Sequence, residues 1–552
     1  MNLNLNTSMK TILFAVKIAI TAFALTLLAL SSRAQYKLQL FHASDLEGGV
    51  EAITKAPHFA AIIDTLEEKY PNSLILSAGD NYISGPFYSS ADARSVRDSI
   101  QKVYNTLYGG INNLNLREGP GRIDISIMNV IGFNASALGN HEFDLGTAAI
   151  ESIIAPEVRS GNDVRWLGAN FPYLSSNLDF SQDGNLSGLF ESTIKETSTY
   201  RFDFANPTSK TKGIAPAAVI TINGEKIGIV GATTPMLERI SSPGNTSVKN
   251  PGAGTNDMNA LAGLIQPQID ALANTGVNKI ILVSHLQQYQ LEEALAGLLS
   301  KVDIIVSGGS DGIFANPGQR LRSGDVATNP YPVLLKNKDN DDVAVVSVDG
   351  QYSYVGHLVV DFDASGKLIT SSINANESRP FPTDSLMVDS LFGQNYSKAF
   401  VANKKGGMVK TLTDAVSSIV IAKDGNIVGK TDVFLDGRRQ TVRTQESNMG
   451  NLTADANHAA AKAYDNDVVF SLKNGGGIRA AIGSIIEEDP GVFTYAPPAA
   501  NPLSGKKEGE VSQLDLENTM KFNNKLTIVT TNPTGLKALV EHGVAAWAVG
   551  AT

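Results

Sequence analysis

The stretch Ala135-Ser136-Ala137-Leu138-Gly139-Asn140-His141-Glu142-Phe143-Asp144 places amide, imidazole and carboxylate groups directly after a short apolar run. The run is too short for a helix and ends at a glycine, so it predicts a buried strand followed by a turn. Polar side chains at the carboxyl ends of buried parallel strands line binding sites. The stretch therefore predicts an α/β fold that presents metal-ligating groups at a strand end.

Four more short apolar runs carry polar groups at their ends. They lie at residues 38–41, 74–76, 280–283 and 304–306, and are followed by Asp45-Leu46-Glu47, Gly79-Asp80-Asn81, Ser284-His285 and Ser307-Gly308-Gly309-Ser310-Asp311. Helical patterns at residues 58–69, 124–132 and 257–274 alternate with these runs. The order predicts β-α-β units around a mostly buried sheet. Oxygen and nitrogen ligands would meet at its edge, which is how a two-metal phosphoester hydrolase is built.

The amino end has the pattern of a signal peptide. Lys10 and Lys17 precede an apolar run at residues 18–30, and Ser32-Arg33-Ala34 offers the small residues that signal peptidase prefers. We predict a signal peptide over residues 1–34, cleaved before Gln35, with an uncleaved membrane anchor as the alternative. No later stretch predicts a membrane span, so the mature protein is expected to be periplasmic or secreted.

Composition narrows the partners. The chain has no cysteine, which excludes disulfides, thiolate-bound zinc and a cysteine nucleophile. Its formal net charge of -10 argues against nucleic acid or an anionic membrane as a partner. Any attraction for phosphate must be local, and a small phosphate ester or nucleotide is the expected substrate.

A composition break at residues 374–407 predicts a linker. It combines Arg379-Pro380-Phe381-Pro382, a short amphipathic run at residues 386–391 and Lys404-Lys405-Gly406-Gly407. Domain boundaries favour such segments. We therefore predict a first domain over residues 35–373 and a second over residues 408–552.

The quoted motifs resemble the calcineurin-like metallophosphoesterase domain of the secreted 5′-nucleotidase family, and Gly-Asn-His-Glu-Phe-Asp is the most specific of them. Ala232-Thr233-Thr234-Pro235 resembles the family segment between the halves of the sheet. The resemblance implies an α/β fold class, with helices and sheets in layers (α+β layered). Its parts would be a four-layer α/β/β/α metallophosphoesterase domain and a carboxyl-terminal α/β substrate-binding domain.

The resemblance also implies roles for residues of the first domain. Asp80 would bridge two divalent cations, with Asp45 on one of them and Asn140 and His285 on the other. His141 would stay off the metals, stabilise charge on the phosphate and protonate the leaving oxygen. Asp144 would orient the His141 imidazole.

Three positions depart from the family pattern. Glu47 and Gly309 stand where the family usually has histidines, and Asp311 stands where its last ligand is histidine or glutamine. Either the site is degenerate and binds phosphate esters without hydrolysing them, or Glu47 and Asp311 ligate metal and change its identity. The second interpretation is favoured because both replacements can coordinate metal. Carboxylate ligands favour Ca, Mn, Mg or Fe over Zn.

The second domain resembles the family's substrate-binding domain through Arg443, residues 446–452, Asn474-Gly475-Gly476-Gly477-Ile478-Arg479 and Phe522. By resemblance Asn474 faces the nucleobase, Phe522 stacks on it, and Arg443 and Arg479 hold phosphate or ribose oxygens. Gly476, within the glycine triplet, allows close approach of the backbone to a ligand. Because the family continues into a segment with a second stacking aromatic, this domain is expected to be truncated.

Glu47 together with Gly-Gly-Ser in the last motif resembles exported atypical alkaline phosphatases of the same superfamily. The expected function is an exported metal-dependent phosphomonoesterase that hydrolyses nucleotides and other phosphate esters by metal-bound hydroxide attack. Two alternatives stay open: a phosphodiesterase or nucleotide-sugar pyrophosphatase, and a non-catalytic nucleotide-binding protein with a degenerate metal site.

Overall fold

The computed structural model describes residues 36–83, 85–110, 114–160, 162–207, 212–310, 312–489, 492–522 and 524–545. The predicted signal peptide (1–34) and the predicted metal ligand Asp311 lie outside these residues. Within them, no helix combines the length and the apolar character that crossing a bilayer requires.

The first sheet holds three of the predicted strands. Its order is β18-β17-β1-β2-β3-β6-β9, with β19 paired to β17. The strands are β1 (Tyr36–Ala43), β2 (Ser73–Ser77), β3 (Ala135–Ala137), β6 (Tyr173–Leu174), β9 (Ile214–Ala215), β17 (Tyr354–Phe362), β18 (Leu368–Ile369) and β19 (Arg379–Pro382). β1, β2 and β3 run parallel, as expected for strands joined by helices.

The second sheet holds the other two predicted strands. Its order is β15-β16-β14-β13-β11-β10-β8. The strands are β8 (Lys195–Glu196), β10 (Ala217–Ile222), β11 (Glu225–Thr233), β13 (Ile280–His285), β14 (Ile304–Gly308), β15 (Val333–Lys336) and β16 (Asp342–Val346). β11, β13 and β14 are parallel, so their carboxyl ends share one edge.

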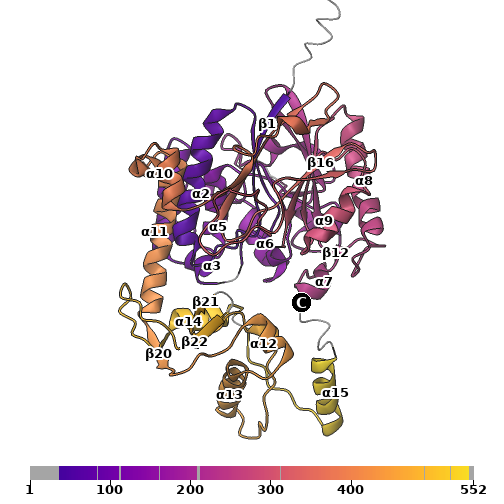
Figure 1. The fold of residues 1–552 in the computed structure, drawn as a ribbon. Helices are drawn as coiled ribbons and strands as arrows, with labels where there is room; N and C mark the ends of the chain where they lie inside the picture. The colour runs from indigo at the N-terminus through magenta and orange to yellow at the C-terminus, as the bar shows by residue number, and fades with distance from the viewer. Residues whose placement is uncertain are drawn as a thin grey trace, which may run out of the picture.

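Helices cover the outer faces of the two sheets (Figure 1). Because side chains alternate along a strand, Leu38 and Leu40 of β1 enter the core between the sheets, whereas Phe41 and Ala43 enter the core under the helices. One outer layer contains α2 (Ala52–Leu66), α4 (Arg94–Leu107), α5 (Arg122–Ile131) and α11 (Lys405–Asp424), and the other contains α8 (Met258–Asn274) and α9 (Tyr289–Ala296). The predicted layered α/β fold class is confirmed.

The remaining elements of the first part are short. They are α3 (Pro86–Ser90), α6 (Thr147–Ile154), α7 (Leu237–Ile240), α10 (Ser385–Leu391), β4 (Glu157–Arg159), β5 (Asp163–Trp166), β7 (Leu178–Asp179) and β12 (Ser247–Val248). The three predicted helices are present. α2 nevertheless begins at Ala52, upstream of residue 58, and carries Pro57 in its interior.

The predicted linker (374–407) is folded against the first part of the chain. β19 pairs with β17, and α11 packs beside α2. Lys404 and Lys405 form ion pairs with Glu68 and Glu67 at 3.1 and 2.6 Å. α11 then leads to the second part (Figure 1). The domain division at this segment stays a prediction.

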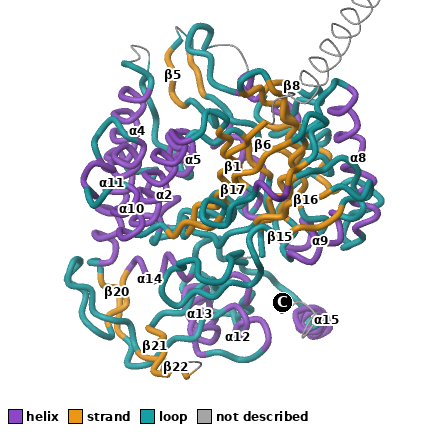
Figure 2. Tube along the Cα trace, turned by 45° about the horizontal axis from the view of Figure 1, so that its top comes forward, coloured by secondary structure: helices purple, strands orange, loops and turns teal. Residues whose placement is uncertain are grey.

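The second part is built from small elements (Figure 2). They are β20 (Ile427–Lys430), α12 (Arg439–Thr444), α13 (Asn448–Lys462), β21 (Ser484–Asp489), β22 (Val492–Ala496), β23 (Glu510–Ser512), α14 (Gln513–Thr519) and α15 (Pro533–Val544). β20 pairs with β23 and β21 with β22. Its described core is small and centres on Met449, Ile478, Ile482 and Val511.

Candidate metal centre

The five predicted strand ends meet at one edge of the two sheets. Asp45 follows β1, Asp80 follows β2, His141 follows β3, His285 ends β13, and Gly309 follows β14. The sheets approach so closely here that a Cβ added to Gly308 would lie 2.7 Å from the Ser44 hydroxyl oxygen. The ligating groups therefore face a single site.

Asp45, Asp80 and His285 form one fully buried group in which the potential ligand atoms lie within 4.8 Å of one another. His285 Nε2 lies 2.9 Å from Asp80 Oδ2 and 3.8 Å from Asp45 Oδ1. Despite the short separation, this buried nitrogen makes no hydrogen bond of normal geometry with the described residues. Its other ring nitrogen, Nδ1, is held by the Ala78 carbonyl oxygen at 2.8 Å. An imidazole that is fixed through Nδ1 and faces two carboxylates with Nε2 fits a divalent cation.

Glu47, Asp80 and His141 form a second group, again with potential ligand atoms within 4.8 Å of one another. His141 Nε2 lies 3.7 Å from Glu47 Oε1. His141 Nδ1 lies 2.6 Å from Asp144 Oδ2, and Asp144 Oδ1 accepts a hydrogen bond from the Ser241 hydroxyl at 2.8 Å. Asp144 thus links the His141 ring to Ser241, and its role in orienting His141 stays a prediction. Because Asp80 belongs to both groups, it is where a bridging carboxylate would be required.

These groups record which ligand atoms lie close together, and the division of ligands between two metals that the resemblance implied stays a prediction. Asp45 and His285, expected on different metals, lie in the same group, and His141, expected off the metals, lies beside Glu47. The Asn140 side-chain oxygen accepts a hydrogen bond from the Gln287 amide. A Cβ on Gly309 would lie 2.8 Å from both Gln287 Nε2 and His285 Nε2, so Asn140, Gln287 and His285 share one corner of the centre.

The charges of the site shift the pKa values of its imidazoles. Burial alone would lower the pKa of His285, but Asp80 and Asp45 together with Glu142 outweigh burial and hold it well above its usual range. Burial would likewise lower the pKa of His141, yet Asp80 and Asp144 raise it to about 9. Burial raises the pKa of Glu47 to about 7. Since an imidazole that ligates a metal is neutral, cation binding at His285 should displace a proton.

Three of the carboxylates are held by left-handed backbone. The φ angles of Asp45, Glu47 and Asp80 are 50°, 50° and 52°. Such conformations are uncommon outside glycine and cluster at functional sites, where the surrounding structure enforces them. Gly309 takes φ 82°, and its N–H donates to Asp45 Oδ2 at 2.9 Å. The glycine thus supplies a backbone donor where the family has an imidazole.

Glu142 is a residue whose role the sequence interpretation missed. Its buried carboxylate accepts hydrogen bonds from the backbone N–H groups of Gly139 (2.7 Å), Asp80 (3.0 Å) and Asn81 (2.7 Å). It therefore ties the loop after β2 to the loop after β3. Its position inside the Gly-Asn-His-Glu-Phe-Asp motif was the available signal. Gln287, two residues after His285, was also missed.

Contacts join the predicted residues of the second part in two sets. A Cβ on Gly476 would lie 3.4 Å from Asn474 Oδ1 and 3.7 Å from Arg443 Nη2, so these three are neighbours. The guanidinium of Arg479 lies 5.2 Å from the centre of the Phe522 ring. α14 lies between β23 and Phe522 in the sequence. Lys521, which the sequence interpretation did not single out, follows α14.

Comparison with known proteins identifies relatives for both parts. Residues 427–551 match the family model described as 5′-nucleotidase, C-terminal domain. The 5′-nucleotidase of Mus musculus is 26% identical over 494 residues, which cover 87% of this chain and 65% of that protein. The snake venom 5′-nucleotidase of Gloydius brevicauda is 28% identical over 467 residues, which cover 81% of this chain and 63% of that protein. The chain spans just under two thirds of these relatives.

A solved structure has a similar fold. The 5′-nucleotidase precursor from Thermus thermophilus superposes with a TM-score of 0.57 at 24% sequence identity, covering 93% of this chain and 79% of that one. This likeness supports the layered α/β architecture. Together with the family model and the curated relatives, it confirms the resemblance to 5′-nucleotidases that the sequence motifs predicted.

Proposed function

We propose that this protein is a metal-dependent phosphoric ester hydrolase that acts on nucleotides and other phosphate monoesters. The observation that carries the proposal is the pair of groups, Asp45, Asp80, His285 and Glu47, Asp80, His141, which share one carboxylate. Sharing of a carboxylate between two ligand sets is what a two-cation phosphoesterase requires. Similarity to the 5′-nucleotidases supports the same substrate class.

In this proposal the chain's own residues divide the work. Asp45, Asp80 and His285 would hold one divalent cation, and Asp80 with Glu47 the other. When bound, such a pair of cations supplies Lewis acidity toward phosphate oxygens and lowers the pKa of water. His141, oriented by Asp144, would stabilise charge on the phosphate and deliver a proton to the leaving oxygen. Asn140 and the undescribed Asp311 complete the proposed ligand set.

The donor set also bears on the metal. Three described carboxylates with one firmly placed imidazole form a harder ligand set than one rich in imidazole. We therefore expect Ca, Mn, Mg or Fe to support activity better than Zn. We propose that the nucleotide is held by Arg443, Asn474, Gly476, Arg479 and Phe522. The proposed location is the periplasm or the exterior of the cell, because the amino-terminal sequence has the pattern of a signal peptide.

A substrate and metal panel tests the proposal. Chelated protein is reloaded separately with each divalent metal, and phosphate release is measured with AMP, p-nitrophenyl phosphate and bis(p-nitrophenyl) phosphate. Metal-dependent turnover that is faster on the monoesters is expected. Faster turnover of the diester would indicate the phosphodiesterase alternative, and nucleotide binding without turnover under every metal would indicate a binding protein.

The catalytic assignment is tested with a matched pair of histidine variants. His141→Ala should lower kcat by about 10²- to 10⁴-fold, because it removes a positioned proton donor. His58→Ala is the control, since His58 lies on α2 and its ring contacts Tyr396, away from the centre. Equal activity of the two variants would overturn the role given to His141.

A further inference from the structure

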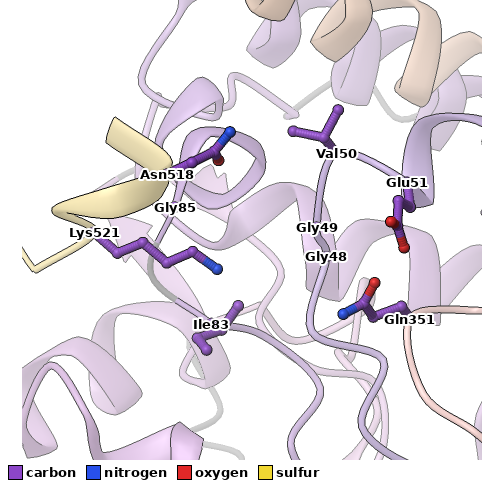
Figure 3. A pocket seen from close by; sticks show the side chains of 9 residues that line it. All are labelled: Gly48, Gly49, Val50, Glu51, Ile83, Gly85, Gln351, Asn518 and Lys521. Carbon is purple, nitrogen blue, oxygen red and sulfur yellow. The ribbon is translucent and has the colours of Figure 1, made fainter. Parts of the chain in front are cut away.

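A cavity lies between the metal-centre loops of the first part and the end of α14. Its volume is about 180 Å³, and it opens between segments far apart in the sequence (Figure 3). The residues that line it are Gly48, Gly49, Val50, Glu51, Ile83, Gly85, Gln351, Asn518 and Lys521. Gly48 and Gly49 directly follow Glu47, so the cavity adjoins the metal centre.

Lys521 enters this cavity from the second part of the chain. Figure 3 shows its side chain extended from the end of α14 with the ammonium group directed into the space beside Gly48 and Ile83. Its aliphatic Cδ and Cε lie 3.8 Å from where a Cβ of Gly85 would be. The lysine stem therefore passes within van der Waals reach of this loop.

The charged neighbours of Lys521 belong to the metal centre and to the nucleotide residues. It interacts electrostatically with Glu47 and Asp144 on one side and with Arg479 on the other. Glu51, the acidic residue of the cavity lining, has its carboxylate 3.0 Å from Lys55 Nζ, so that acidic group has a partner of its own. Lys521 is thus placed where the metal centre and the proposed nucleotide residues adjoin.

The charge of the proposed centre calls for such a cation. With Asp311 included, the proposed carboxylate ligands Asp45, Glu47, Asp80 and Asp311 would cancel the charge of two divalent ions, whereas a phosphate monoester brings about two negative charges near neutral pH. An unbalanced negative charge in a partly buried site is costly. Lys521 would offset one of these two charges.

We propose that Lys521 is a substrate-binding residue whose ammonium group binds a non-bridging oxygen of the phosphoryl group and offsets the carboxylate at Glu47. This inference rests on the proposed phosphoesterase function and adds to it. It adds a lysine to the residues of the second part, Arg443 and Arg479, that are proposed to hold phosphate or ribose oxygens.

Charge and length variants at residue 521 test the inference. Lys521→Met removes the charge and keeps an unbranched stem, and it should lower kcat/KM for p-nitrophenyl phosphate by about 10- to 100-fold, the range for loss of a hydrogen bond to a charged group. Competitive inhibition by inorganic phosphate should weaken by a similar factor. Lys521→Arg keeps the charge and should recover most of both losses. Lys525→Met, at an exposed lysine of the same segment, is the control and should match the wild type.

A second readout does not depend on turnover. Metal-loaded wild-type protein is acetylated with and without inorganic phosphate, and the extent of labelling of each lysine is measured by mass spectrometry. Phosphate should protect Lys521 and leave Lys525 equally reactive. If wild-type protein hydrolyses esters but Lys521→Met keeps its kcat/KM and phosphate gives no protection, the inference fails while the proposed function stands. If wild-type protein hydrolyses no ester with any metal, the proposed function fails, and the inference falls with it.

Discussion

Replacing Glu142 by glutamine keeps the volume of a buried side chain but removes half of its hydrogen-bond acceptors. In the structure, Oε1 accepts from Asn81 N at 2.7 Å and from Asn81 Nδ2 at 3.1 Å. Oε2 accepts from Gly139 N at 2.7 Å and from Asp80 N at 3.0 Å. Because an amide nitrogen only donates, glutamine can satisfy one of these two pairs and must face the other pair with its NH2 group.

The loss follows from this geometry. Two buried donors lose a charged acceptor, and at about 1.5 kcal/mol for each such hydrogen bond the free energy of unfolding should fall by about 3 kcal/mol. For a cooperative unit of the size of the first domain, this corresponds to a midpoint about 4 °C lower. Since the same carboxylate fixes the loops that carry Asp80 and His141, metal affinity should also fall, by about 10- to 100-fold.

Thermal unfolding with and without metal, together with a metal titration, measures both effects. The experiments belong at pH 8, because burial and the charge of Asp80 raise the pKa of Glu142 to about 7 and the wild-type carboxylate must be ionised. Glu151→Gln is the control, since Glu151 is exposed on α6. If Glu142→Gln unfolds within about 1 °C of the wild type and binds metal equally well, Glu142 does not hold the loops together.

Three further predictions address the glycine, a buried acid and the metal. Gly309→Ala places a Cβ 2.8 Å from His285 Nε2, at φ 82°, and should weaken metal binding. The control is Gly318→Ala, at φ 83° with open space around it, which should only cost about 1–2 kcal/mol of stability. Similar metal affinity in both variants would refute the steric argument. Burial holds the pKa of Asp124 well above its usual range. Above the ordinary aspartate pKa, this carboxyl group is therefore protonated in the folded protein but ionised in the unfolded chain. The free energy of unfolding consequently falls as the pH rises through this region. Asp124→Asn should therefore stabilise the protein in urea unfolding at pH 7 but not at pH 4, and an equal effect at both would contradict this. Chelation should lower the unfolding midpoint, and metal at 100 times its Kd should restore about 2.7 kcal/mol; an unchanged midpoint would argue against a metal centre.

The fold and the gathering of ligands were predictable because they follow from local patterns. A strand buried on both faces reads as a short continuous apolar run, and β2, β13 and β14 each appear in the sequence as such a run. The residue types after each run then give the ligands. Parallel pairing places these ends at one edge, so the sequence could predict which of these residues meet.

The partners that cross between elements could not be predicted in this way. Which ligands lie close together depends on the distances between the two sheets. The 3.8 Å between Asp45 Oδ1 and His285 Nε2, for example, cannot be inferred from the motifs. The hydrogen bond from Gln287 to Asn140 and the approach of Lys521 to the cavity join elements that are distant in the sequence. No local pattern marks either of them.

The segment predicted as a linker shows that a pair of glycines can have more than one structural meaning. In the sequence, Gly406 and Gly407 indicate flexibility. In the structure they lie in the first turn of α11, where a Cβ on Gly407 would come within 2.1 Å of the Val401 carbonyl oxygen and one on Gly406 within 2.9 Å of the Ala61 Cβ. These glycines permit close packing of backbone against backbone and side chain, which the sequence alone does not distinguish from a flexible joint.

Glu47 and Lys521 are best understood as a pair that couples cation binding to anion binding. A carboxylate in place of an imidazole strengthens the attraction for hard divalent cations but reduces the positive charge left for a phosphate group. In the proposed site, Lys521 would repel a cation that approaches without an anion and would attract the phosphate that accompanies it. By linkage, phosphate that is bound should then tighten cation binding by the same factor by which the cations tighten phosphate binding. The second part of the chain would thereby favour a centre in which metal and ester are bound together over one in which either is bound alone.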